Sequence, residues 1–202
     1  LFWAVGASDA ALAGLTWFGA ALSLVVLAGF LPMAGLAALW ALYLSVYSMG
    51  SVFLGFQWDV LLLEAGALAV FAAPWGLRPS LATESAPGAV PLWLVRWLWF
   101  RLLFLAGAVK LASGDPVWWD LSALSFHFET QPLPHALSWY AHVLPAGVLK
   151  AGCLGMFVVE LALPFAVFLP RRPRLAAFLG VNALMAAIVL TGNYTFFNLL
   201  AV

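Results

Sequence analysis

Long apolar runs recur along this sequence of 202 residues, and they constrain its fold more than any other feature. A helix of about 20 mostly apolar residues, rising about 1.5 Å per residue, crosses the hydrocarbon core of a membrane, which is about 30 Å thick. We therefore predict an all-α fold: a polytopic transmembrane helical bundle that forms a single domain over 1–202. The runs predict about six spans, at residues 10–31, 35–51, 57–74, 91–111, 146–169 and 175–190.

The low content of charged residues supports a membrane environment. Hydrophobic residues make up 66% of the chain and charged residues 8%, whereas soluble domains carry about a quarter charged residues. A surface with so few charges must face lipid, so the lipid bilayer is an expected partner. Because the net charge is zero, no basic surface is available and no nucleic-acid partner is expected. A single cysteine, Cys153, excludes an intramolecular disulfide.

Motifs that hold cofactors are absent from the sequence. There is no Gly-rich phosphate loop, nucleophile elbow or HExxH zinc motif. His135 and His142 are seven residues apart, and the corresponding rise of about 10.5 Å along a helix is too large for one metal ion. His127 and Glu129 have an ordinary loop spacing, which is weak as a metal motif. We therefore expect no cofactor and no metal.

The arginines predict which side of the membrane each connector faces. The connectors after the first, third and fifth spans lie on one side, and they contain Arg78, Arg171, Arg172 and Arg174, with Arg96 close by. That side is predicted to be cytoplasmic by the positive-inside rule. The connector 112–144 and the tail TGNYTFFN at 191–198 then face away from the cytoplasm. Because the chain opens without methionine and ends within an apolar pattern, we expect it to be a segment of a longer protein.

Several ionisable residues fall inside predicted spans, where an ionised group is costly unless it is paired or beside water. Asp59 lies at a span start, where the helix dipole favours an acid, and Glu64 lies about 7.5 Å deeper. Arg101 requires a carboxylate partner, which Glu64 or Glu160 can supply. Glu160, before a helix kink predicted at Pro164, fits either such a pair or a proton or ligand site. The predicted structural polar residues are Asp59, Glu64, Arg96, Arg101 and Glu160.

Lys110 ends the fourth predicted span and is the leading candidate for chemistry. It either extends its ammonium group to the membrane interface, near the helix C-terminus, or acts as a desolvated base or substrate anchor. His127 and Glu129, in the following connector, are candidates to assist it. No complete catalytic constellation is evident.

Three stretches of the chain resemble the lipase maturation factor family. They are FQWDVLLLE at 56–64, the segment at 93–134 that contains SGDP and FETQPLP, and TGNYTFFNLL at 191–200. The residues that match the family's motifs are Gln57, Trp58, Gly114, Asp115, Pro116, Thr130, Gln131, Pro132, Asn193, Tyr194 and Asn198.

This resemblance implies a maturation factor and not a lipase. Animal members of the family lie in the membrane of the endoplasmic reticulum and help dimeric lipases reach their active form. The Ala- and Trp-rich composition resembles a bacterial member, for which the inner membrane is the expected location. The leading hypothesis is a non-enzymatic factor that assists the folding or maturation of secreted lipases or other exported proteins.

A second, shorter resemblance leaves an enzyme as the alternative. The segment AGAVKLASGDPVWWD is similar to vitamin K-dependent carboxylase and related bacterial membrane domains. That similarity implies that Lys110 acts as a base on a lipid-like or quinone-like substrate. A transporter is a third class, and it rests on Glu64, Arg101 and Glu160 alone.

Overall fold

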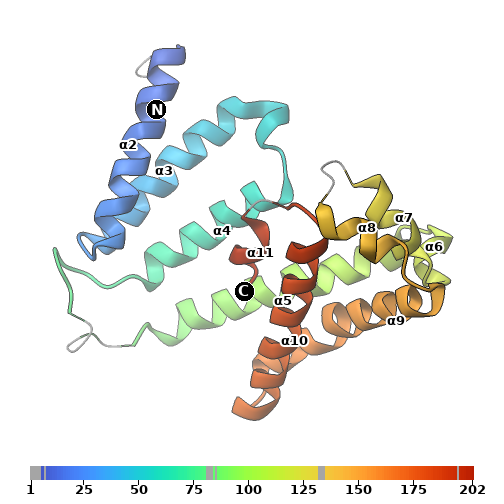
Figure 1. Ribbon diagram of the computed structural model, residues 1–202. Coiled ribbons are helices and arrows are strands. Elements are labelled where there is room, and N and C mark those ends of the chain that lie inside the picture. Colours follow the sequence, from blue (N-terminus) through green and yellow to red (C-terminus); the bar gives the residue numbers. More distant parts are fainter. Residues whose placement is uncertain (1–5, 7, 81–83, 85, 132–134, 195) are drawn as a thin grey trace. The chain divides into compact units, whose positions relative to one another are not determined.

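The computed structural model describes residues 6, 8–80, 84, 86–131, 135–194 and 196–202. All regular structure in this part of the chain is helical, which confirms the predicted all-α class. Contacts divide the chain into two compact units, Leu1–Val95 and Arg96–Val202, with the boundary inside helix α5. The elements (Figure 1) are α2 (Asp9–Leu27), α3 (Pro32–Gly50), η1 (Ser51–Leu54), α4 (Gln57–Ala72), α5 (Ala89–Ala112), α6 (Pro116–Trp119), α7 (Ala123–Thr130), α8 (Ala136–His142), α9 (Ala146–Phe157), η2 (Val158–Ala162), η3 (Leu163–Phe168), α10 (Arg171–Thr191) and α11 (Phe197–Leu200).

Among the residues that the structure describes, five helical segments are long and apolar enough to cross a membrane. They are Asp9–Leu27, Pro32–Gly50, Ala89–Ala112, Ala146–Phe168 and Arg171–Thr191. The remaining predicted span, 57–74, corresponds to α4, whose 16 residues extend over about 24 Å. α4 ends early because Pro74 forces the preceding residue, Ala73, out of the helical region, to φ −72° and ψ 144°.

Two predicted span boundaries differ from those in the structure, and proline explains both. The first span was predicted to end at residue 31 and the second to begin at residue 35, but α2 ends at Leu27 and α3 begins at Pro32, where the missing N–H group of proline costs no hydrogen bond. The basic turn at 170–174 was expected to connect two spans, but α10 already begins at Arg171 and includes Pro173 in its first turn. Proline is tolerated at these positions because the first N–H groups of a helix have no partner within the helix.

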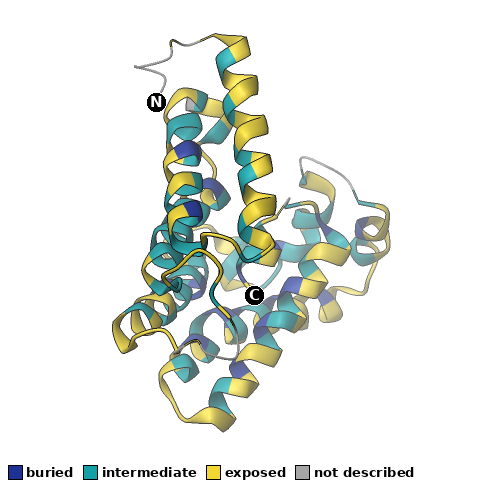
Figure 2. Cartoon of the chain, turned by 90° about the vertical axis from the view of Figure 1, so that its left-hand side faces the viewer, coloured by how far each residue is buried: buried dark blue, intermediate teal, exposed yellow. Residues whose placement is uncertain are grey.

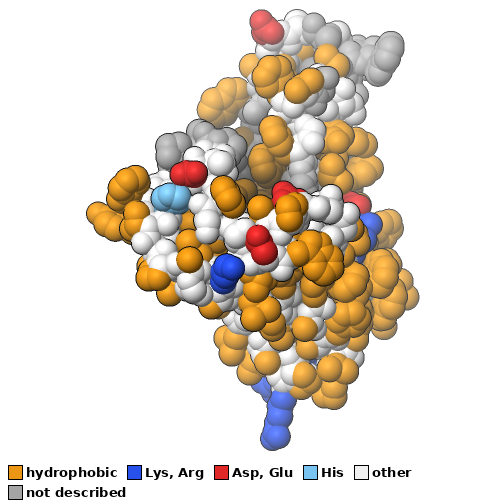
Figure 3. Space-filling view, turned by 90° about the vertical axis from the view of Figure 1, so that its right-hand side faces the viewer, with side chains coloured by type: hydrophobic (Ala, Val, Ile, Leu, Met, Phe, Trp, Pro, Cys, Tyr) orange, Lys and Arg blue, Asp and Glu red, His pale blue; other side chains and the backbone are white. Residues whose placement is uncertain are grey.

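Large apolar side chains cover much of the surface, as the membrane interpretation requires. Figure 2 shows that exposed and intermediate positions predominate along the helices, and Figure 3 shows a face on which hydrophobic side chains outnumber charged ones. Trp17 in α2 is 76% exposed and Leu27 is 83% exposed. Water solvates such side chains poorly, whereas the hydrocarbon of a bilayer accommodates them. The fold and the composition together define an integral membrane protein.

In the first unit, α3 packs against both α2 and α4. Two side chains of α3 bind α4 directly. The indole Nε1 of Trp40 donates to the backbone oxygen of Leu63 at 2.9 Å, and the hydroxyl of Tyr43 donates to Asp59. Asp59 is 2% exposed, and its other carboxylate oxygen accepts from the N–H of Phe56 at 3.3 Å. Asp59 therefore caps the start of α4 and links it to α3.

The core of the second unit forms between α5, α10 and the end of the chain. Its buried residues are Leu103, Val181, Met185 and Ala201. The indole of Trp99 packs on this cluster and donates a hydrogen bond of 3.1 Å to the backbone oxygen of Ala201. The C-terminal residues are thereby bound to the middle of α5.

The connector 112–144 contains three short helices, α6, α7 and α8, and none of them is long enough to span a membrane. Gly114 adopts a positive φ of 74°, which glycine tolerates without a Cβ clash, and it turns the chain away from α5. Asp115 then caps α6, because its carboxylate accepts from the N–H of Val117 at 3.1 Å. His135 caps α8 in the same way, since its Nδ1 accepts from the N–H of Leu137 at 3.2 Å.

The two ends of α10 lie in different surroundings. At its C-terminal end, the backbone oxygen of Thr191 accepts a hydrogen bond of 2.9 Å from Nε2 of Gln131, which follows α7 in the connector. At its N-terminal end are Arg171, Arg172 and Arg174. The 21 residues of the helix separate the two ends by about 30 Å. Within this unit, the connector and the tail therefore lie together, at the end of α10 opposite to the arginines.

Candidate functional site

An ion pair buried among the helices of the second unit forms the centre of the candidate site. The ammonium Nζ of Lys110, at the end of α5, lies 2.8 Å from Oε1 and 2.7 Å from Oε2 of Glu160. The side chain of Glu160 is 8% exposed and that of Lys110 is 24% exposed. Because the ammonium group donates to both carboxylate oxygens, the two charges compensate each other where little water reaches them. The ion pair also holds α5 against the segment that follows α9.

The helix that carries Glu160 changes its winding at this residue. α9 gives way to a π-helical turn at Val158–Ala162 and then to a 3₁₀ segment at Leu163–Phe168. Pro164 lies at the start of the 3₁₀ segment and has no N–H group to donate to the carbonyl of Glu160, so an α-helix cannot continue here. A kink was predicted at Pro164, and the structure has a change of helical winding that begins before it, at Val158. π-turns within helices are often found at functional positions.

Gly107, one turn before Lys110, allows the two helices to approach closely. A Cβ atom at this position would lie 2.8 Å from Cγ and Cδ2 of Leu161 and 3.1 Å from Cβ of Glu160. These distances are shorter than ordinary carbon contacts, so only glycine fits without displacing the π-turn. The sequence analysis did not identify this glycine, although its spacing of three residues from Lys110 places both on one helix face.

Aromatic and apolar side chains enclose the ammonium group. The Nζ atom of Lys110 lies 5.7 Å from the ring centroid of Trp118, within range of a cation–π interaction. Trp118 in turn contacts Phe157 edge to face, with 6.1 Å between ring centroids. Phe157 belongs to a buried cluster with Ala123 and Cys153. The lone cysteine is thus part of an apolar wall beside the ion pair.

His127 and Tyr194 form the second pair of the site, and they come from segments 67 residues apart. Their rings are parallel within 2°, with 6.4 Å between centroids, and the Tyr194 hydroxyl lies 3.3 Å from Nε2 of His127. Burial lowers the pKa of His127, and the positive charge of Lys110 lowers it further. Burial also raises the pKa of Tyr194. Both side chains are therefore held neutral near pH 7.

Gly192 brings the tail against the connector. A Cβ atom there would lie 2.7 Å from the ring of Tyr194 and 2.8 Å from Oε1 of Gln131. The absence of a side chain allows Gln131 to reach the backbone oxygen of Thr191 at the end of α10. The motif TGNY in the tail and the motif ETQ in the connector therefore meet through Gln131, Gly192 and Tyr194.

The other candidate residues lie outside this centre. Glu129 is exposed, and its Oε2 lies 3.4 Å from Nε2 of His142. The Thr130 hydroxyl donates to the backbone oxygen of Phe126 at 2.9 Å. Asn193 is exposed, whereas Asn198 is 3% exposed within α11. Of the remaining family-motif residues, Gln57 and Trp58 open α4, Pro116 opens α6, and Pro132 lies outside the described residues.

Lys110 occupies a different environment from the interface position considered in the sequence analysis. Its ammonium group turns inward to Glu160. Glu160 was one of the two predicted partners of Arg101. In the structure, its carboxylate binds Lys110. The pairing of Arg101 with Glu64 or Glu160 stays a prediction, as does the structural role of Arg96.

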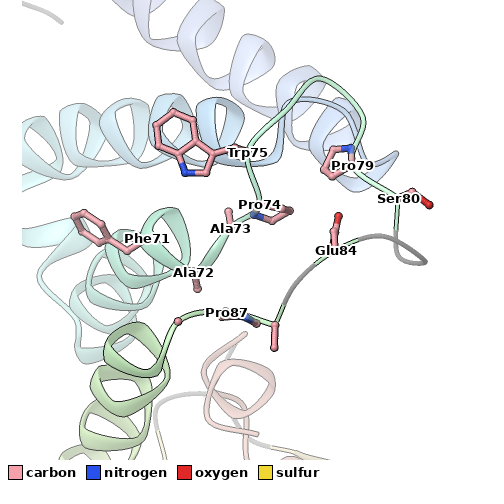
Figure 4. A pocket seen from close by; sticks show the side chains of 11 residues that line it. Phe71, Ala72, Ala73, Pro74, Trp75, Pro79, Ser80, Glu84 and Pro87 are labelled. Carbon is pink, nitrogen blue, oxygen red and sulfur yellow. The ribbon is translucent and has the colours of Figure 1, made fainter.

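Two pockets of the structure are lined by residues of the first unit alone. The pocket in Figure 4 has a volume of about 560 Å³, and the end of α4 and the chain that leads toward α5 line it, with Phe71, Trp75, Pro79, Glu84 and Pro87 among its residues. Lys110, His127 and Glu129 do not line it. Among the described residues, no three His, Cys, Asp or Glu side chains converge as metal ligands would. In the part of the chain that the structure describes, the site therefore consists of paired side chains.

The environment of His127 predicts a pH dependence of stability. Its pKa in the fold lies below the ordinary 6.5, so the unfolded chain takes up a proton before the folded one does. Stability is complete above pH 6.5 and declines as the pH falls below it toward the lowered pKa. The melting temperature should fall between pH 7.5 and pH 5.5, and His127→Phe should reduce that fall. His135→Asn, which keeps a cap on α8, should leave the fall unchanged. An equal pH dependence in His127→Phe and the wild type would contradict the assignment.

Helices that are long and apolar enough to cross a membrane, joined by shorter helices, define a polytopic helical membrane protein. The sequence model described as "Lipase maturation factor transmembrane domain" matches residues 1–202, so the chain belongs to the lipase maturation factor family. This confirms the first resemblance drawn from the sequence.

Named relatives support the same membership. The chain is 51% identical to lipase maturation factor 2 of Homo sapiens over 173 residues, which are 80% of this chain and 24% of that protein. The protein of the same name from Xenopus laevis is 49% identical over 81% of the chain and 24% of its own length. Lipase maturation factor 1 of Mus musculus is 35% identical over 89% of the chain and 31% of its own length. The chain thus spans about a quarter to a third of these relatives, and no solved structure matches it.

Proposed function

We propose that the chain is the membrane-embedded part of a factor that assists the maturation of secreted lipases or other exported proteins. One observation carries the proposal: family motifs far apart in the sequence meet at one end of the second unit. Lys110 binds Glu160, His127 binds Tyr194, and Gln131 binds Thr191. Side chains from the connector and the tail are thereby held at fixed positions beside the end of α5. A fixed polar surface of this kind suits the recognition of a client chain.

The pairing of Lys110 supports a non-catalytic role. A general base needs a neutral amine within reach of the proton that it removes. The ammonium group of Lys110 instead donates to both oxygens of Glu160, so this carboxylate holds it as a structural partner. Glu129, the candidate assistant, faces His142. The alternative of an enzyme related to vitamin K-dependent carboxylase has less support from this arrangement.

The proposed location follows from the side that holds the site. The arginine-rich end of α10 is assigned to the cytoplasm, so the opposite end faces the lumen of the endoplasmic reticulum in a eukaryotic cell or the periplasm in a bacterium. Exported proteins fold in these compartments. The site would therefore meet its clients on the side where they emerge from the membrane.

Deletion of the gene tests the proposed function. Cells that lack it should secrete several-fold less active lipase, while lipase synthesis stays unchanged, and the full-length protein should restore secretion. Lipase activity in the medium and lipase antigen in the cell are the measurements. Unaltered secretion of active lipase would count against a role in maturation.

Lys110→Arg separates the factor from the enzyme. Arginine keeps the positive charge and can bind both oxygens of Glu160, but its pKa above about 12 prevents it from acting as a base. A maturation factor should retain its activity in this variant, whereas an enzyme that uses Lys110 as its base should lose activity at normal abundance in the membrane. Lys150→Arg, on the exposed face of α9, is the matched control.

A further inference from the structure

A groove of about 470 Å³ lies in the first unit and is lined by none of the residues of the site described above. Residues of α2, α3 and α4 line it, among them Leu15, Leu39, Leu42 and Leu62. On α2 the lining positions are Leu15, Thr16, Gly19 and Ser23, which share one helix face. The groove runs along this face, and Gly19 leaves room in its wall because it has no side chain.

The polar side chains of the wall have partners within the protein. Thr16 donates to the backbone oxygen of Leu12 at 2.9 Å, and Ser23 donates to that of Ala20 at 2.7 Å. Trp40 donates to the backbone oxygen of Leu63, and Tyr43 donates to Asp59. Because these hydroxyl and indole groups already donate hydrogen bonds within the protein, they need no polar partner in the groove. The groove therefore suits a hydrocarbon chain and not a polar ligand.

The mostly apolar lining of the groove favours hydrocarbon over water as its filling. α2 and α3 are both candidate spans, and the lining residues Leu15 to Ser23 lie in the middle of α2. Empty space lined by apolar side chains forfeits dispersion contacts, and apolar cavities remain dry until an apolar molecule enters. In the bilayer core, the available molecules are the acyl chains of lipids.

Arg78 supplies charge complementarity at one end of the groove. The N–H of Leu31, in the turn between α2 and α3, donates to the backbone oxygen of Leu77 at 2.8 Å. The guanidinium of Arg78 lies 4.9 Å from the ring centroid of Phe30, in the same turn, and Arg78 is exposed. Ser23, which lines the groove, is five residues before Ala28 at the start of this turn, about 7.5 Å along the axis. Arg78 is exposed beside the turn that follows this end of the groove, and a guanidinium can bind a phosphate group through two parallel hydrogen bonds.

We propose that this groove holds one acyl chain of a glycerophospholipid whose phosphate binds Arg78 at the cytoplasmic side of the membrane. The acyl chain would fill the space between α2 and α4, along α3. This binding site is independent of the proposed role in maturation, because it uses other residues and another unit of the chain.

Lipid retention by the purified full-length protein tests the proposal. The protein is extracted in a mild detergent, incubated with palmitoyl-oleoyl phosphatidylglycerol, and weighed intact by native mass spectrometry. We expect one retained phospholipid per chain. Gly19→Leu fills the groove, and retention should fall on the order of tenfold, as expected when about two fewer CH₂ groups are buried. Gly14→Leu is the matched control on α2, because no atom lies within 4 Å of a Cβ at Gly14, and it should retain the lipid.

Two further variants keep the test decisive. Ser23→Phe fills the same groove from a second position and replaces Gly19→Leu if that variant does not fold. Arg78→Ala should weaken retention of the phospholipid several-fold but not the binding of a neutral diacylglycerol with the same chains. Absence of a retained phospholipid in the wild type, or equal retention by the Gly19→Leu and Gly14→Leu variants, would overturn the proposal.

Discussion

Replacing Glu160 by leucine is expected to lower the free energy of unfolding by about 3 to 5 kcal/mol. The substitution leaves the ammonium group of Lys110 without the carboxylate that it contacts at 2.7 Å. Removing one partner of a buried pair is costly because the remaining charge is desolvated without compensation. Lys110 is at the end of α5 and is 24% exposed, so partial access to the interface should place the effect near the lower end of this range. Unfolding of the full-length protein in mixed micelles, followed by circular dichroism, measures the change.

Two controls separate the ion pair from a general effect of lost charge. Glu129→Leu removes a carboxylate whose side chain is 59% exposed and lies 3.4 Å from His142, and surface pairs of this kind contribute about 1 kcal/mol or less. The double variant Lys110→Leu with Glu160→Leu removes both charges and should be more stable than the Glu160→Leu single variant. A double variant whose destabilisation equals the sum of both single variants would contradict the pairing.

Replacing Gly107 by leucine should also destabilise the second unit strongly. Even the Cβ of alanine would lie 2.8 Å from the side chain of Leu161, and overpacking of this kind costs about 1 to 3 kcal/mol. Leucine adds three more carbon atoms to the same contact, so its effect should exceed that of alanine. Because the π-turn must move to accept the new side chain, Glu160 should also separate from Lys110. The same unfolding measurement applies.

Gly155 offers the matched control for Gly107. It lies in α9, and no atom is within 4 Å of a Cβ placed on it. Alanine at this position should be neutral or slightly stabilising, because alanine has a higher helix propensity than glycine by up to about 1 kcal/mol. Equal losses of stability for Gly107→Ala and Gly155→Ala would show that close helix packing at Gly107 is not the cause.

Local patterns in the sequence were sufficient for the class of fold. The apolar runs predicted the spanning helices because a span is a continuous stretch of apolar residues, which can be recognised without knowing the rest of the fold. A kink at Pro164 was predicted for a similar reason, since a missing N–H group acts within its own helix. The family resemblance rested on continuous motifs such as SGDP and FETQPLP. The helix starts at Pro32 and Arg171 were not predicted, because Pro32 and Pro173 were interpreted as residues outside helices. In the structure both prolines lie in the first turn of a helix.

The pairing of charges could not be derived from the chain alone. Lys110 and Glu160 are 50 residues apart, and Glu160 was equally compatible with Arg101 as long as the order of helix packing was unknown. The contact depends on two local features that have meaning only when the helices meet: the missing side chain of Gly107 and the π-turn at Val158–Ala162. The same holds for His127 and Tyr194.

The sequence by itself determined that this chain is an α-helical membrane protein of a recognisable family, and it identified the stretches that carry the polar residues. In lipid, every backbone polar group must form its hydrogen bond within the protein, so few folds are possible. The composition and the spacing of apolar runs are therefore sufficient for that conclusion. Only the tertiary structure decided which of those residues meet. Side-chain contacts between helices depend on packing at the scale of a single methyl group, as at Gly107, and no periodicity in one helix encodes the position of another.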